Sequence, residues 1–238
     1  MTKVNNWLKS AQIRLWPQCC QLCGDGPLDF DSVLCDGCLN DMPWNTHCCP
    51  VCALPLHHDA ICGRCLRKPP AYHRALATFS YRDPISHIVH GLKFGQRLYY
   101  GRFLGEQLAE TVLRAEHLIM PDVLIPMPLH RKRMIERGYN QAHEIARPVA
   151  RRLELPIALD IVARQRETAE QSRLNALQRC RNLKDAFCVT GSASGLHVAI
   201  VDDVMTTGAT VGELARVLVV AGVRRIDVWL GARAPLAR

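Results

Sequence analysis

Apolar and polar positions follow two different patterns along the chain, and the change comes near residue 70. After the prolines at positions 69 and 70, short apolar segments alternate with stretches of helical periodicity, which is typical of an α/β sheet. The expected strands cover residues 75–81, 123–125, 197–201 and 225–230, and the expected helices cover residues 85–92, 103–118, 140–153 and 208–221. Before residue 70, large apolar residues are few, and so short a segment commonly needs metal ions or disulfides to fold.

Neither a membrane span nor an export signal is expected. The longest apolar runs fall far short of the roughly 20 residues that a membrane helix needs. Polar residues also interrupt every apolar stretch of the first 18 residues, unlike the core of a secretory signal. We therefore expect a cytoplasmic protein whose thiols stay reduced, which favours metal binding over disulfides.

The cysteines predict two zinc sites. Ten of the twelve lie between Cys19 and Cys65, and eight of these form four C-x-x-C pairs separated by loops of 11, 10 and 9 residues. Two residues between cysteines let one tight turn aim both thiolates at a tetrahedral ion, and a second turn completes a four-thiolate site. The expected ligands of the two structural zinc ions are Cys20, Cys23, Cys35, Cys38, Cys49, Cys52, Cys62 and Cys65.

These eight cysteines can pair into two sites in more than one way. A weak internal duplication, with Pro and Leu following Cys23 and again Cys52, favours sequential ribbons. A cross-braced arrangement, in which the first and third pairs share a metal, stays open because spacing alone cannot assign connectivity. Redox chemistry is disfavoured because four pairs occur within 46 residues. The expected divisions are an amphipathic segment 1–16, a double zinc ribbon 17–70 and a larger domain 71–238.

The formal charge of +8 lies entirely after residue 70. Residues 1–70 hold six Lys or Arg and six Asp, which leaves 24 of the 30 basic and 16 of the 22 acidic residues for the rest. Residues 131–181 alone hold 12 basic and six acidic residues. Such a positive field favours anionic partners, phosphates or nucleic acid among them.

Residues 199–210 carry the candidate chemistry. They lead from an apolar strand through Asp202 and Asp203 into a Thr- and Gly-rich turn at a helix start. Such a turn offers N–H groups and hydroxyls to one anion, and the helix dipole assists, so it can hold a phosphate monoester. Two carboxylates would repel that phosphate unless ligand hydroxyls or a divalent cation lay beside them. A phosphate with vicinal hydroxyls describes a ribose 5-phosphate; the alternative is a Rossmann-like turn whose acids cap the helix.

This segment resembles the signature of type I phosphoribosyltransferases, which recognise phosphoribosyl pyrophosphate together with magnesium. The resemblance implies that Asp202 and Asp203 are catalytic and contact the ribose hydroxyls. It also implies a mostly parallel α/β sheet flanked by helices. The residues that would wrap the 5-phosphate are Thr206, Thr207, Gly208, Ala209 and Thr210.

The cysteine pairs followed by this signature resemble the ComF/GntX family of competence and DNA-utilisation proteins, over nearly the whole chain. The stretches Leu92-Lys93-Phe94, Pro126-Met127-Pro128-Leu129-His130 and Arg137-Gly138-Tyr139-Asn140-Gln141-Ala142 agree with the family. Tyr139 stands where Phe is expected and Met205 where Leu is common, and neither change touches ligand chemistry. Taken alone, Lys93 and His130 are expected to be surface or packing residues.

Two further groups of residues follow from the resemblance. A cluster that would approach pyrophosphate or nucleic acid consists of Arg131, Lys132, Arg133 and Arg137, whose cationic groups suit a polyphosphate. The polar segment 164–173 resembles the flexible loop that closes over the reaction centre and excludes water, although composition alone fits a solvated loop equally well. Its candidate residues are Arg164, Arg166, Gln171 and Arg173.

Three hypotheses of function remain. In the first, the protein is a magnesium-dependent phosphoribosyltransferase-like enzyme with a role in DNA uptake or utilisation. In the second, the same fold binds single-stranded DNA or a nucleotide without catalysis, although aromatic platforms are scarce. In the third, the ribbons are an adaptor for a partner, such as a helicase-like competence protein. The acceptor, the survival of catalysis and the oligomeric state do not follow from the sequence.

Overall fold

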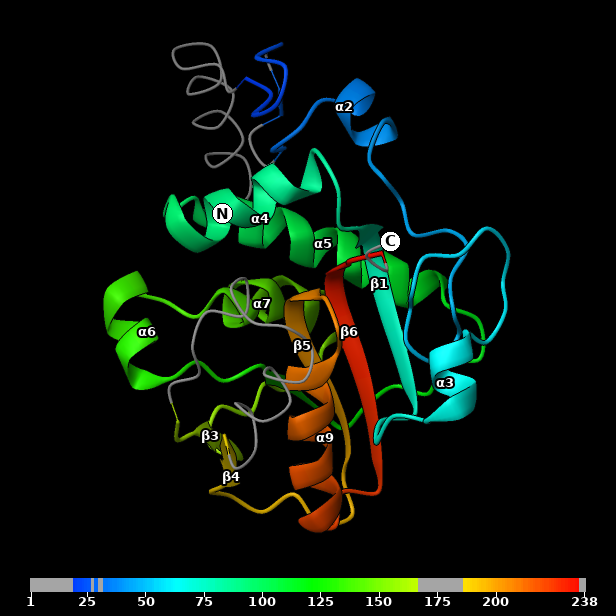
Figure 1. Ribbon diagram of the computed structural model, residues 1–238. Coiled ribbons are helices and arrows are strands. Elements are labelled where there is room, and N and C mark those ends of the chain that lie inside the picture. The colour runs from blue at the N-terminus through cyan, green and yellow to red at the C-terminus, as the bar shows by residue number, and fades with distance from the viewer. Residues whose placement is uncertain (1–18, 27, 30–31, 167–185, 236–238) are drawn as a thin grey trace. The chain divides into compact units, whose positions relative to one another are not determined.

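The computed structural model of the 238-residue chain (Figure 1) describes residues 19–26, 28–29, 32–166 and 186–235. It divides into two compact units, Met1–Pro43 and Trp44–Arg238. The described part of the first unit contains one short helix, α2 (Asp36–Asn40), which Cys35 caps by accepting from the Cys38 amide. The second unit contains the second cysteine group together with the α/β sheet. The domain limits expected from the sequence, at residues 17 and 71, stay predictions.

A parallel sheet forms the centre of the second unit. Its four strands stand in the order β1 (Arg74–Ser80), β6 (Arg225–Arg233), β5 (His197–Met205) and β2 (Val123–Pro126). All neighbouring strands run parallel. The inner strands β5 and β6 are buried along nearly their whole length, as expected of parallel strands that are covered on both faces.

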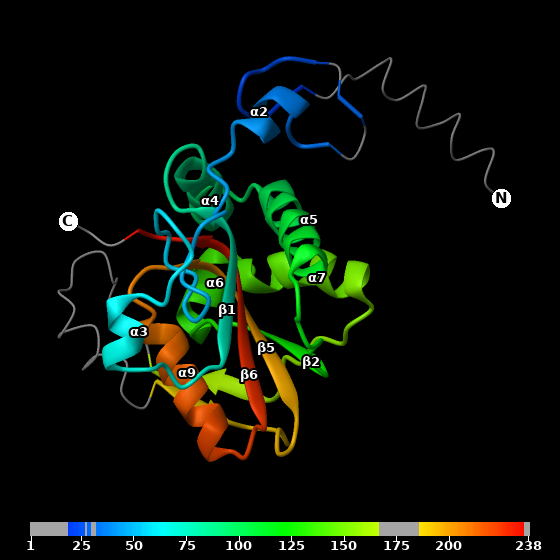
Figure 2. The ribbon, with the colours of Figure 1, turned by 90° about the vertical axis from the view of Figure 1, so that its right-hand side faces the viewer.

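Helices cover both faces of this sheet, as Figure 2 shows. On one side lie α4 (Ile85–Phe94), α5 (Leu98–Arg114) and α7 (Gln141–Leu153), and on the other lies α9 (Ala209–Val220). Helices α5 and α7 cross closely because Gly105 lacks a side chain: a Cβ there would collide with the backbone of Ile145 and the ring of Pro148.

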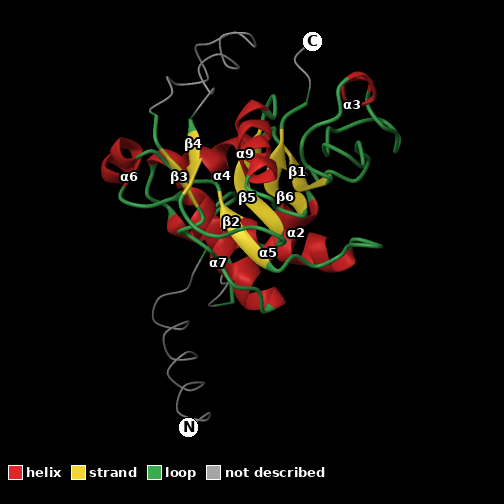
Figure 3. Cartoon of the chain, turned by 90° about the horizontal axis from the view of Figure 1, so that it is seen from below, coloured by secondary structure: helices red, strands yellow, loops and turns green. Residues whose placement is uncertain are grey.

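Four shorter elements complete the second unit. Strands β3 (Val162–Arg164) and β4 (Phe187–Val189) pair antiparallel as a separate ribbon beside the main sheet (Figure 3). Helix α3 (Gly63–Arg67) carries the last zinc-ligand candidates, and α6 (Arg131–Arg137) follows β2. No helix in the described ranges is long and apolar enough to cross a membrane.

The α/β sheet and its four strands and four long helices confirm the expected fold class. One boundary was wrong in an informative way: β5 continues to Met205 instead of ending at Val201, because Val204 and Met205 pair with Ala232 and Arg233 of β6. Helix α5 also begins at Leu98 and ends at Arg114, whereas the expected span was 103–118. Elements α3, α6, β3 and β4 were not predicted, since three to seven residues are too few to establish a periodicity.

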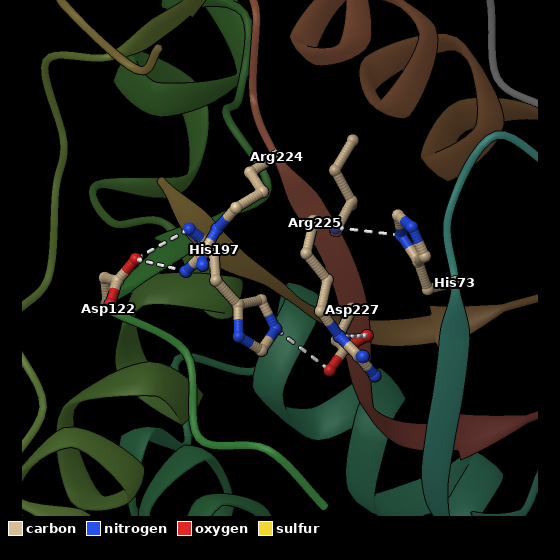
Figure 4. A network of polar contacts seen from close by, with 7 residues as sticks. His73, Asp122, His197, Arg224, Arg225 and Asp227 are labelled. Atoms are coloured by element: carbon tan, nitrogen blue, oxygen red, sulfur yellow. Dashed lines mark hydrogen bonds and ion pairs between the residues drawn. The ribbon is translucent and has the colours of Figure 1, made fainter. Parts of the chain in front are cut away.

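A network of hydrogen bonds and ion pairs lies where β5 and β6 begin, at the amino end of the sheet (Figure 4). The buried His197 ring lies 3.1 Å from the Asp227 carboxylate, and Arg225 Nε donates to the other oxygen of Asp227 at 3.3 Å. Asp122 accepts from the His197 amide at 2.7 Å and lies 3.8 Å from Arg224. These contacts fix the register of the inner strands at the end opposite the candidate chemistry.

Candidate functional site

The two adjacent acids lie on β5, near its carboxyl end, and both are buried, with 8% of Asp202 and 2% of Asp203 exposed. Successive residues of a strand point to opposite faces of its sheet. Asp203 accordingly meets α4, where Lys93 Nζ lies 2.7 Å from its Oδ2. Asp202 shares its face with Ile200, which packs in the core with Leu214 and Leu218 of α9. The two acids therefore lie on opposite faces of the sheet, each toward one layer of helices.

The two acids differ in their electrostatic surroundings. Burial, and next the neighbouring Asp203 charge, raise the pKa of Asp202 to about 8, although Lys93 opposes the shift. Burial alone would lower the pKa of Lys93, but the charge and hydrogen bond of Asp203, together with the charges of Asp202 and Tyr81, outweigh this effect and raise it. The site thus combines the Lys93–Asp203 ion pair with a second carboxyl group, Asp202, whose raised pKa favours its protonated form.

Lys93 makes a contact that the sequence did not predict. Taken alone it was expected to be a surface or packing residue, and the fold places its ammonium group on Asp203. The available signal was the Leu92-Lys93-Phe94 stretch. His130, by contrast, has a structural role: it is the N-cap of α6, and its Nδ1 accepts from the Lys132 amide at 3.3 Å.

The turn after β5 connects directly to α9. Gly208 caps that helix with a φ of +79°, a left-handed conformation that glycine adopts without the strain of a Cβ. The Thr207 hydroxyl accepts from the Ala209 amide at 3.3 Å, and Thr206 is exposed. Ala209 and Thr210 form the first turn of α9, so the amino end of that helix and its dipole lie at the same end of the sheet as Asp202.

The basic cluster of residues 131–137 forms α6, and the structure brings two of its four candidates to Lys93. Arg133 and Arg137 line one pocket with Lys93 and Phe94. The Arg137 guanidinium lies 5.3 Å from the centre of the Phe94 ring and donates to Gln141 at 2.6 Å. Arg131 and Lys132 are exposed and do not line this pocket.

Only the start of the expected lid lies in the described residues. Arg164 is the last residue of β3, paired with Phe187, so the loop begins one residue later than expected. Burial lowers the pKa of Arg164, and the charge of Asp202 counteracts the shift. Arg166 is exposed. Gln171 and Arg173 lie outside the described residues.

The eight expected ligands gather as two groups of four sulfur atoms. In each group, all the Sγ atoms lie within 4.8 Å of one another: Cys20, Cys23, Cys35 and Cys38 in one, Cys49, Cys52, Cys62 and Cys65 in the other. This is the sequential pairing, and four thiolates at tetrahedral spacing fit a structural zinc ion. The two zinc ribbons of the sequence analysis are therefore confirmed, with the cross-braced alternative excluded.

Comparison with known proteins agrees with this arrangement. The double zinc ribbon domain family matches residues 12–66. The DNA utilization protein YhgH of Salmonella typhi is 38% identical over 200 residues, which cover 82% of this chain and 88% of that protein. Competence protein F of Haemophilus influenzae is 35% identical over 210 residues, which cover 84% of this chain and 90% of that protein. The chain belongs to the ComF/GntX family.

Solved structures similar to this ComF/GntX protein include phosphoribosyltransferases. The glutamine phosphoribosylpyrophosphate amidotransferase of B. subtilis, complexed with ADP and GMP, gives a TM-score of 0.38 at 19% identity and covers 55% of this chain and 26% of its own. The hypoxanthine phosphoribosyltransferase of Trypanosoma cruzi, complexed with its product IMP, gives a TM-score of 0.35 at 15% identity, with coverages of 59% and 76%.

Proposed function

We propose that this protein binds phosphoribosyl pyrophosphate, or a related ribose 5-phosphate, at the carboxyl end of β5, as a phosphoribosyltransferase-like protein of DNA uptake or utilisation. One observation carries the proposal: two buried acids near the carboxyl end of β5 are followed, after two more strand residues, by the turn that leads into α9. The turn offers amides and hydroxyls to a phosphate, while Asp202 and Asp203 offer carboxylates to the ribose hydroxyls. The names of its relatives support the biological setting.

The surrounding charges suit such a ligand. Lys93 compensates Asp203, so the two acids together present less negative charge to a phosphorylated sugar than two free carboxylates would. Arg133 and Arg137 line the neighbouring pocket and can receive a pyrophosphate group. Magnesium fits the same donor set, because Mg²⁺ takes one or two protein carboxylates together with substrate phosphate oxygens. When bound, it would neutralise charge on the departing pyrophosphate.

Catalysis in this proposal is displacement at C1 of the ribose. The bond between C1 and the pyrophosphate oxygen breaks, the pyrophosphate leaves with the electron pair, an acceptor nitrogen bonds to C1, and the proton of that nitrogen passes to the departing pyrophosphate or to water. The chain contributes orientation and charge: Asp202 and Asp203 hold the ribose, Arg133 and Arg137 stabilise the leaving group.

Calorimetric titration with phosphoribosyl pyrophosphate and magnesium tests the binding. The double variant Asp202→Asn/Asp203→Asn should lose binding by about a hundredfold, since two hydrogen-bonded contacts disappear. Asp160→Asn is the matched control, because Asp160 is an exposed acid outside this site. Wild-type protein that does not bind, or a double variant that binds equally well, would refute the proposal. Release of pyrophosphate with candidate acceptors separates turnover from binding.

The second candidate is non-catalytic binding of single-stranded DNA or a nucleotide, or an adaptor role with a helicase-like partner. The surface of α6 and the end of α4 favours the nucleic-acid version: Arg131 and Lys132 of α6 are exposed, and 58% of Phe94, the last residue of α4, is exposed beside the Arg137 guanidinium. An exposed ring beside cations can stack an unpaired base. A DNA affinity that falls steeply with salt, and falls further in Phe94→Ala, would support it. A salt-independent affinity would argue against phosphate contacts.

A further inference from the structure

The second zinc ribbon lies in the same compact unit as the proposed phosphate turn and contacts it directly. Helix α3 connects two of its cysteines, Cys62 and Cys65, and carries Arg64 between them. Arg64 Nη2 donates a 2.8 Å hydrogen bond to the carbonyl oxygen of Thr207, at the centre of the turn.

A second arginine makes the same connection from inside the core. Arg233, the last residue of β6, is 2% exposed. Its Nε donates a hydrogen bond of 3.1 Å to the carbonyl oxygen of Cys52, a residue of the second zinc ribbon. Its Nη1 donates to the carbonyl of Met205 at 2.9 Å and to that of Thr206. One buried guanidinium therefore joins a zinc-ligand residue to the end of β5 and the start of the turn.

These contacts help to orient the amides of the turn. The carbonyls of three consecutive residues, Met205, Thr206 and Thr207, accept from the two guanidinium groups, and that of Met205 also accepts from the Ala234 amide. A trans peptide is planar, with its N–H opposite its C=O. The amides that follow those carbonyls, on residues 206, 207 and 208, are consequently directed away from the two arginines. Consecutive amides that point the same way form an anion-binding concavity.

The zinc site also offsets the burial of Arg233. Within the ranges that the structure describes, this guanidinium hydrogen-bonds to carbonyl oxygens and no carboxylate lies within ion-pair distance. A buried cation without a counter-charge is costly. Four thiolates exceed the charge of one Zn²⁺ by two, so the loaded site at Cys49, Cys52, Cys62 and Cys65 supplies negative charge beside Arg233.

We infer that the second zinc ribbon sets the geometry of the phosphate turn, with Arg64 and Arg233 as positioning residues that touch the turn's carbonyls rather than the ligand. The inference rests on the proposed function for the identity of the ligand. It gives the ribbon a part in ligand binding beyond holding the fold.

Arg64→Ala tests the inference, with Arg67→Ala as the matched control. Arg67 lies on the same helix, is also exposed, and the structure gives it no hydrogen bond to residues 206–210. Ribose 5-phosphate is titrated into each full-length, zinc-loaded variant, and amide hydrogen exchange of residues 206–209 is measured without ligand. Arg64→Ala should bind about five- to tenfold more weakly, the effect of one charge-assisted hydrogen bond, and exchange faster, while Arg67→Ala should match wild type.

The outcomes separate the inference from the proposed function. If wild type fails to bind ribose 5-phosphate, the proposed function fails, and the exchange measurement alone decides whether the ribbon orders the turn. Equal exchange in both variants overturns the inference. Faster exchange in Arg64→Ala with wild-type affinity overturns it as well, because turn geometry would then be irrelevant to the ligand. Arg233→Lys, which keeps the charge but lacks the fork of donors, should reproduce the loss where the variant folds.

Discussion

The chain contains two cysteine groups with the same C-x-x-C spacing, and they differ in their surroundings. In the first group Cys20 is buried, Cys23 is exposed and the other two are half-buried, while all four ligands of the second group are buried. The second group also belongs to the hydrophobic core that includes Leu214, Ile226 and Val228 of the α/β sheet and α9. Identical ligand chemistry can therefore serve a separate small unit or become part of the core of an α/β unit.

The largest effect should come from removing ligands of the second group. Cys49→Ser/Cys52→Ser should lower the free energy of unfolding of the second unit by more than about 4 kcal/mol, since loss of a structural metal is among the few severe lesions. Cys20→Ser/Cys23→Ser should leave that unit's transition unchanged. Near-ultraviolet circular dichroism of the buried Trp229 during urea unfolding follows the second unit. Equal losses in the two variants would contradict the comparison.

A variant that lowers the stability of the second unit at the opposite end of the sheet serves as a reference for the effect of Arg64→Ala on ligand affinity. Asp227→Ala breaks the buried contact with His197 and should cost about 3 kcal/mol, the lower range for an interrupted buried pair. Because Asp227 lies at the amino end of β6, ribose 5-phosphate affinity of the folded variant should be unchanged. Urea unfolding and calorimetry measure the two quantities. If Asp227→Ala weakened binding as much as Arg64→Ala, ligand affinity would simply follow global stability.

Zinc release should resolve the two sites in time. With a chelator in excess, the first site, whose Cys23 is exposed, should release its zinc at least about tenfold faster than the fully buried second site, a difference of about 1.4 kcal/mol in barrier. Absorbance of a metallochromic indicator should rise in two phases. Cys20→Ser/Cys23→Ser should remove the fast phase alone, and a single phase in wild type would argue that burial does not distinguish the sites.

The smallest expected effect concerns pH. Since the folded pKa of Asp202, about 8, exceeds the ordinary value of 3.8, the folded state retains a proton that the unfolded state has lost. Stability contributed by this group is therefore present at low pH and declines as pH rises toward and through 8. Urea unfolding measures the free energy of unfolding at pH 7 and at pH 9. This free energy should fall between the two pH values in wild type, and in Asp202→Asn the fall should be smaller by at least about 1 kcal/mol. Parallel curves for the two proteins would count against the raised pKa.

Much of the candidate site was accessible from local sequence. Asp202, Asp203 and the turn up to Thr210 are contiguous, so their order alone indicated a strand, a turn and a helix start. Lys93 was not accessible in this way, because its meaning depends on α4 packing beside β5 and placing its ammonium group on Asp203. Arg64 and Arg233 were missed for the same reason: more than 140 residues separate Arg64 from its acceptor Thr207.

The sequence by itself determined the main strands and long helices in outline, the eight candidate zinc ligands, and the order of the two acids and the Thr/Gly turn. Each of these rests on spacing over a few residues, which chain geometry converts directly into local structure. The pairing of the ligands into two groups of four came from the structure. The tertiary structure decided what those parts do together. It extended β5 past the acids through pairing with β6, and placed only Arg133 and Arg137 of the basic cluster beside Lys93. It also built one zinc ribbon into the core. Contacts between distant segments depend on packing, which no local pattern encodes.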